Sequence, residues 1–103
     1  MSYLNCLDIT TNTDIQATGS YGYKMFLIDC SAGNINITLP INYNVSYKFF
    51  RIDNTSNTCT FTCQSGDTIN NLTSLTFPIN TYSEIYYQVG KKNWLFPKYT
   101  FSF

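Results

Sequence analysis

The chain has 103 residues and a formal net charge of zero, with 12% charged, 44% hydrophobic and 17% aromatic residues. This composition excludes a disordered tail, which is rich in charge and poor in aromatic residues. Zero net charge argues against a nucleic-acid partner. Because the chain has no histidine, it lacks the commonest general base and the commonest zinc ligand. We therefore expect no enzyme activity, no metal site and no cofactor.

The composition also predicts the fold class. Two alanines and one glutamate leave the chain poor in strong helix formers, whereas it holds 14 threonines, nine tyrosines and eight phenylalanines, which favour strands. The apolar run Met25–Ile28 is four residues long, and a membrane-spanning helix needs about 20. We expect a single all-β domain over residues 1–103 that does not insert into a membrane.

The first half of the chain alternates between strand and turn patterns. Residues 9–18 predict a first strand. Residues 23–29 and 35–39 predict two strands joined by a tight turn, which together form a hairpin that Pro40 ends. Residues 47–53 and 58–63 predict a second hairpin. The broken alternation within 47–53 indicates a β-bulge or burial of both faces.

The second half continues the pattern with no linker and no internal repeat. Ile69 and Leu72 are predicted to close one end of the core. Short strands follow at residues 75–77, 82–89, 94–96 and 99–103. The chain thus holds about eight strands, spaced about 8–12 residues apart, as in an antiparallel β-sandwich or barrel.

The four cysteines are predicted to be free thiols. Cys59, Phe61 and Cys63 share one face of a strand, where cysteine acts as a small buried hydrophobe. Cys59 and Cys63 would lie about 13 Å apart along that strand, too far for a disulfide. The N-terminal residues lack a signal-peptide pattern, so we expect synthesis in the reducing cytoplasm of a host cell.

The order of these segments resembles the head, or tip, domains of viral fibres and phage tail fibres. The resemblance begins in residues 26–40, where an apolar strand, an Asp, a Ser-Ala-Gly turn and an alternating strand end in Leu-Pro. It covers about residues 9–96 and continues through residues 47–53, 57–61, 65–69 and the turn at 90–94.

The resemblance implies a homotrimeric all-β module on a virion surface that attaches the particle to a host or partner surface. The expected partners are other copies of the chain, other virion proteins and a glycan or glycoprotein receptor. A small capsid or appendage (decoration) protein that binds no receptor is the alternative. The family has no fixed binding residues, so none is transferred.

The charged and aromatic candidates each have a structural interpretation beside the functional one. Asp29, Asp53 and Asp67 could supply a glycosidase pair, but each lies beside turn residues, where Asp bonds local backbone N–H groups. Glu84 is predicted to face solvent. Trp94 could stack on a sugar but is predicted to anchor the core.

The receptor-binding candidates are Tyr43 and Asn44 in one loop and Lys91 and Lys92 in another. Tyrosine and asparagine form adaptable contacts in recognition loops, although Tyr43 could equally hold its loop to the core. The two lysines could meet an anionic partner or simply be solvated. Loops rich in Asn, Ser, Thr and Tyr suit hydroxyl-rich partners such as glycans.

Overall fold

The computed structural model describes residues 6–15, 25–41, 46–88 and 90–97 and the backbone of 101–102, and within them the chain is all β. In the described residues, no helix is long and apolar enough to cross a membrane. The strands are β1 (Cys6–Ile9), β2 (Thr13–Asp14), β3 (Met25–Ile28), β4 (Ile35–Thr38), β5 (Ser46–Arg51), β6 (Cys59–Thr62), β7 (Thr68–Ile69), β8 (Ser74–Thr76), β9 (Thr81–Gln88), β10 (Asn93–Leu95) and β11 (Phe101–Ser102).

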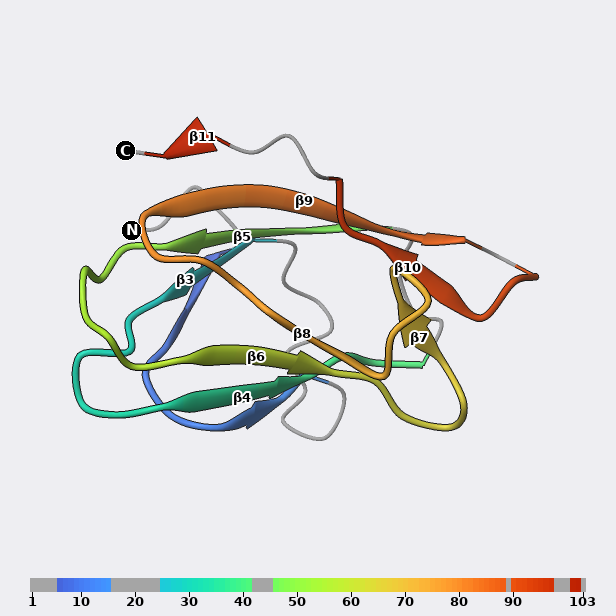
Figure 1. Ribbon diagram of the computed structural model, residues 1–103, viewed down its shortest axis with the longest axis horizontal. Helices are drawn as coiled ribbons and strands as arrows, with labels where there is room; N and C mark the ends of the chain where they lie inside the picture. Colours follow the sequence, from blue (N-terminus) through green and yellow to red (C-terminus); the bar gives the residue numbers. More distant parts are fainter. Residues whose placement is uncertain (1–5, 16–24, 42–45, 89, 98–100, 103) are drawn as a thin grey trace.

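These strands form two sheets that face each other like a sandwich (Figure 1). The first sheet has the order β1-β3-β5-β9-β10-β7, and β11 also pairs with β9. The second sheet has the order β2-β4-β6-β8. The predicted all-β, sandwich-like class is confirmed.

The two predicted hairpins are wrong. β3 and β4 do not pair with each other: β3 lies in the first sheet between β1 and β5, and β4 lies in the second between β2 and β6, all in parallel. β5 and β6 are separated in the same way. Each strand–turn–strand unit is therefore an arch that crosses from one sheet to the other, so both sheets are mixed rather than antiparallel. An arch places its two strands on opposite sides of one core, whereas a hairpin places both on the same side.

The arches stack as a repeat that the sequence analysis missed. Ile35 pairs with Cys59 and Ile37 with Phe61, a shift of 24 residues each time. The turns repeat as well. The Asp29 carboxylate accepts hydrogen bonds from the Ser31 N–H at 3.0 Å and from its hydroxyl. The Asp53 carboxylate, 24 residues on, accepts the equivalent two bonds from Thr55, at 3.3 and 2.7 Å.

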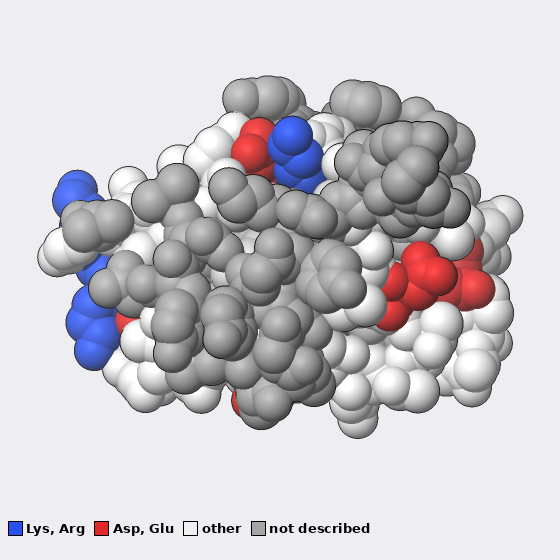
Figure 2. Space-filling model, turned by 180° about the vertical axis from the view of Figure 1, so that it is seen from behind, with Lys and Arg blue, Asp and Glu red and all other residues white. Residues whose placement is uncertain are grey.

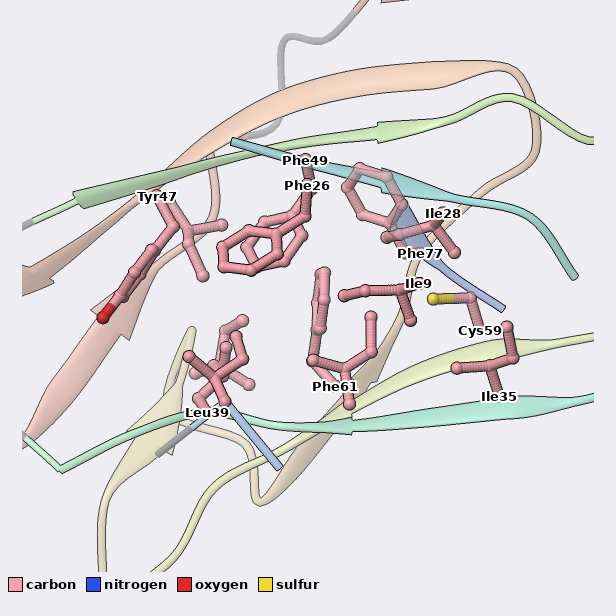
Figure 3. Close-up of a cluster of buried hydrophobic side chains, with 14 of the residues drawn as sticks. Ile9, Phe26, Ile28, Ile35, Leu39, Tyr47, Phe49, Cys59, Phe61 and Phe77 are labelled. Carbon is pink, nitrogen blue, oxygen red and sulfur yellow. The ribbon is translucent and has the colours of Figure 1, made fainter. Parts of the chain in front are cut away.

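The core lies between the sheets and is rich in aromatic rings (Figure 3). Phe49 of the first sheet lies 5.1 Å from Phe26 and 4.7 Å from Phe61 of the second sheet, between ring centroids. All three side chains are fully buried. Cys59 is also buried, and the four cysteines are free, as predicted.

A buried ion pair holds the turn between β5 and β6. The Arg51 guanidinium binds both oxygens of Asp53, at 3.0 and 3.1 Å, and also donates to the carbonyls of Phe77 and Asn57. Asp53 in addition accepts the N–H of Cys30 in the neighbouring arch at 2.9 Å. Burial alone would raise the pKa of Asp53, but the bonds from Arg51 and from the backbone hold that pKa well below its usual range. We call the region of these turns, at one end of the sandwich, the arch end.

The outer face of the first sheet, which points away from the core, also carries apolar residues. Met25 and Leu27 alternate with buried Phe26 and Ile28, so they point away from the core. Leu27 pairs with Phe50, and Phe50 with Tyr82, whose ring centroid lies 4.4 Å away. These outer side chains are half-buried. The broken alternation in β5 therefore reflects two apolar faces; within Ser46–Arg51 buried and half-buried positions alternate regularly, so a bulge is not needed.

Candidate functional site

The end of the sandwich opposite the arch end brings together two turns that lie far apart in the sequence (Figure 1). One, at residues 64–67, follows β6, and the other, at residues 90–92, joins β9 to β10. The Lys92 carbonyl accepts the Thr68 N–H at 3.0 Å, and the Lys92 ammonium donates to the Ser65 carbonyl at 2.8 Å. We call this pair of turns the loop end.

Both turns depend on residues that tolerate a left-handed backbone. Ser65 and Gly66 have φ of 56° and 81°, and the Asp67 N–H donates to the Gln64 carbonyl at 3.0 Å. Two successive residues of positive φ inside such a four-residue turn define type I′, which favours Gly, Asn and Asp. Lys92 also has a positive φ, of 53°, and its bond to Ser65 helps to hold that conformation.

The Asn93 side chain links the two turns of the loop end through hydrogen bonds. Its side-chain oxygen accepts the Thr68 hydroxyl at 2.6 Å and the Asn71 N–H at 3.0 Å. Its amide group donates to the Gln88 side chain at 2.8 Å. The residue is only 6% exposed, so these bonds form in surroundings where an unmade bond is costly. Sequence reasoning placed Asn93 in a turn and missed this role, because Thr68 and Asn71 are more than 20 residues away along the chain.

The two lysines predicted to bind a receptor have different surroundings. Both are exposed. The Lys92 ammonium is held by Ser65, so this residue positions the turns. The Lys91 backbone N–H donates to the Gln88 carbonyl at 3.0 Å, while its side chain has no hydrogen bond or ion pair within the described part of the chain. Lys91 is thus a fixed backbone position with an available ammonium group.

Tyr43 and Asn44, the other two predicted binding residues, lie outside the described residues. Of the four predicted residues, the structure therefore describes only Lys91 and Lys92, which lie in the same exposed turn, and the prediction for Tyr43 and Asn44 stays untested.

Charge differs between the ends of the molecule. Seen from behind in Figure 2, basic side chains lie at one end and also beside an acidic one near the middle of the upper edge, and the largest group of acidic side chains lies toward the other end. Lys91 and Lys92 belong to the loop end, while Asp29 begins an arch and Asp53 is buried and paired with Arg51. The loop end therefore offers a cation beside uncharged hydroxyl and amide groups.

Beneath the loop end lies a buried polar cluster. Asp67 is 4% exposed and accepts the Tyr87 hydroxyl at a long 3.4 Å. The second Asp67 oxygen and the Trp94 indole N–H have no partner among the described residues. Burial, and then Asp67, raise the pKa of Tyr87, and the same two causes raise that of Cys63 to about 11. Both groups stay protonated at neutral pH, so neither is an activated nucleophile.

An uncharged groove of about 760 Å³ opens beside the loop end. Its lining is mainly apolar, with two amide side chains: Asn70, Asn71, Leu72, Leu75, Tyr86, Leu95, Phe96 and Pro97. Leu72 is 53% exposed, so the prediction that it closes the core is wrong, whereas Ile69 is fully buried as predicted. The left-handed Asn70 and Asn71 turn the chain back and carry Leu72 outward. The sequence did not predict this groove, because its lining comes from β8, β9 and β10 and a local pattern does not show which strands become neighbours.

The other sequence candidates have structural roles. Asp29 and Asp53 bond turn N–H groups, as predicted, and Trp94 is fully buried in the core. The Asp67 carboxylate instead meets Tyr87, because its turn directs the side chain inward. Glu84 is half-buried and accepts the Tyr86 hydroxyl at 2.9 Å.

The described residues contain no group of three or more His, Cys, Asp or Glu placed to hold a metal ion. Comparison of the chain with known protein families, with curated proteins and with solved structures finds no match.

Proposed function

We propose that this chain is a virion-surface or fibre-head module that attaches a viral particle to a glycosylated host or partner surface through its loop end. The observation that carries the proposal is the locked pair of turns, which presents the Lys91 ammonium from a fixed backbone. Loops on a rigid β scaffold are common binding sites, because the scaffold holds the contacts in place at little entropic cost.

The chemistry of the loop end fits a hydroxyl-rich ligand. Ser65 and Gly66 are exposed in the turn that Lys92 holds to the Lys91 turn, and their backbone and hydroxyl groups can exchange hydrogen bonds with sugar hydroxyls. One contact of this size is weak. Several copies bound together gain avidity of about 10²–10⁴-fold when their spacing fits the surface.

A homotrimer would supply that multivalency. The apolar residues on the outer face of the first sheet support assembly through that face. Closed symmetry is the usual way in which a small protein buries such a surface. The trimer axis would then leave the loop ends of the three copies equivalent.

A structural role without receptor binding is the second candidate. It is favoured by the uncharged groove and by exposed Leu72 and Leu95, at 53% and 42%, because such surfaces commonly contact other proteins. In that case the chain would be a capsid or appendage component that binds its own kind or other virion proteins.

A glycan array and host-cell binding decide between the two. We expect the purified protein to bind, Lys91→Arg to keep binding, and Lys91→Ala to weaken it at least several-fold without changing the fold. Binding that is equal in all three proteins contradicts the site. No binding by the wild type to any glycan or host surface contradicts attachment and leaves the structural role.

A further inference from the structure

The second sheet ends in a strand whose outer edge has no partner in the described chain. β8 pairs with β6 alone. The Phe77 N–H donates to the Cys59 carbonyl at 2.8 Å, and the Cys63 N–H donates to the Thr73 carbonyl at 3.4 Å. Because bonding alternates along an antiparallel pair, Leu75 also faces β6, whereas the backbone N–H and C=O groups of Ser74 and Thr76 point away from it.

This edge carries few of the features that normally prevent edge-to-edge pairing. Natural edges are guarded by charged residues, by proline, by a bulge or by being very short, and only the last applies within β8. The stretch from Thr68 to Ser83 contains no Asp, Glu, Lys or Arg. Its one proline, Pro78, lies beyond the strand. Ser74 and Thr76 are themselves exposed, so a second strand can approach without displacing a side chain from the core.

We infer that the edge of β8 pairs with β8 of a second copy of this chain, antiparallel and about a two-fold axis. The register places Ser74 opposite Thr76 of the second copy, with Leu75 opposite its own equivalent on the axis. Each Ser74–Thr76 pair exchanges two hydrogen bonds. The pairing therefore satisfies every outward N–H and C=O of Ser74 and Thr76 in both copies.

A second copy fits this edge because the edge is complementary to itself. The outward groups of Ser74 and Thr76 are related by the two-fold operation, which is the condition for an isologous contact. The same register sets Leu72, 53% exposed, against Pro78 of the second copy, which is also exposed. β8 is only three residues long, so its few backbone hydrogen bonds need the added stabilisation of the apolar contact between Leu72 and Pro78 of the second copy.

The contact does not compete with the proposed trimer. It uses the edge of the second sheet, while the trimer was assigned to the outer face of the first. The β8 contact alone gives a dimer, and where its two-fold axes cross the trimer axis the two contacts close into six chains, twice the mass of the trimer. It also leaves Lys91 outside the paired strands.

Charge placed on the two exposed edge positions tests both the contact and its register. In S74K/T76K, like charges face each other across the two-fold axis and destabilise the pair. In S74K/T76E, a lysine at 74 faces a glutamate at 76 of the second copy. Sedimentation equilibrium over a concentration series should give the wild type and S74K/T76E twice the mass of S74K/T76K, with unchanged far-ultraviolet circular dichroism spectra.

Two results would overturn the inference. One is a wild-type mass that stays at one or three chains at every concentration, which needs no variant to interpret. The other is loss of the doubled mass in S74K/T76E, since a parallel or shifted pairing would place its charges differently. Neither result bears on glycan binding by Lys91, so the failure of this contact and the failure of attachment are distinguishable.

Discussion

The arch end and the loop end use polar side chains in opposite ways. At the arch end, the Arg51–Asp53 pair is buried and its atoms are bonded to one another, to turn N–H groups and to carbonyls. At the loop end, Lys92 and Asn93 join the turns, but the Lys91 ammonium extends outward. The buried charges at the arch end therefore hold the turns, whereas at the loop end the Lys91 ammonium is available to a partner.

The largest expected effect is at the buried ion pair. Asp53→Ala leaves the Arg51 charge buried without its partner, which typically costs about 3–5 kcal/mol of the free energy of unfolding. Asp29→Ala is the matched control, because Asp29 occupies the same position in the preceding arch but is half-buried and bonds Ser31. We expect about 0.5–1.5 kcal/mol for the control. Urea denaturation measures both, and equal losses would contradict the assigned role of the pair.

The pH dependence of stability tests the role of the same ion pair. Because folding lowers the pKa of Asp53, its contribution to stability is complete well above its unfolded pKa of about 3.9 and is lost as pH falls toward the folded value. The wild type should therefore lose free energy of unfolding steadily below about pH 4. Asp53→Asn, which cannot titrate there, should show a smaller loss over the same range. Parallel pH profiles for the two proteins would contradict this account.

Asn93→Ala is expected to have an intermediate effect at the loop end. It removes the acceptor shared by the Thr68 hydroxyl and the Asn71 N–H, two part-buried bonds, at a cost of about 0.5–1.5 kcal/mol for each bond lost. Hydrogen exchange of the Thr68 and Asn71 amides should accelerate more than exchange in the arches. Uniform acceleration would show that Asn93 supports the whole fold rather than this end.

How much the sequence predicts differs between the two ends. The all-β class, the buried Trp94 and the turn roles of Asp29 and Asp53 follow from local patterns. The arches do not, because a strand–turn–strand pattern is the same for a hairpin and an arch, and only the partner strand differs. The 24-residue recurrence of Asp-x-Ser/Thr, at Asp29 and Asp53, was the available signal.

The candidate site was only partly predictable. Lys91 and Lys92 are recognisable as residues of an exposed turn, but the bond that ties Lys92 to Ser65 joins segments 27 residues apart. Nothing local distinguishes the two lysines. The groove and the edge of β8 depend in the same way on which strands become neighbours.

The smallest expected change in stability is at Lys91, and the same substitution gives the most direct test of the account. Lys91→Ala removes an exposed charge and should alter the free energy of unfolding by less than about 0.5 kcal/mol. The decisive measurement is binding of the wild type, Lys91→Ala and the exposed arch-end variant Ser56→Ala to host cells or immobilised glycans. The account predicts that wild type and Ser56→Ala bind alike and that Lys91→Ala binds at least several-fold more weakly. Equal binding by all three proteins, or a loss in Ser56→Ala alone, would contradict it.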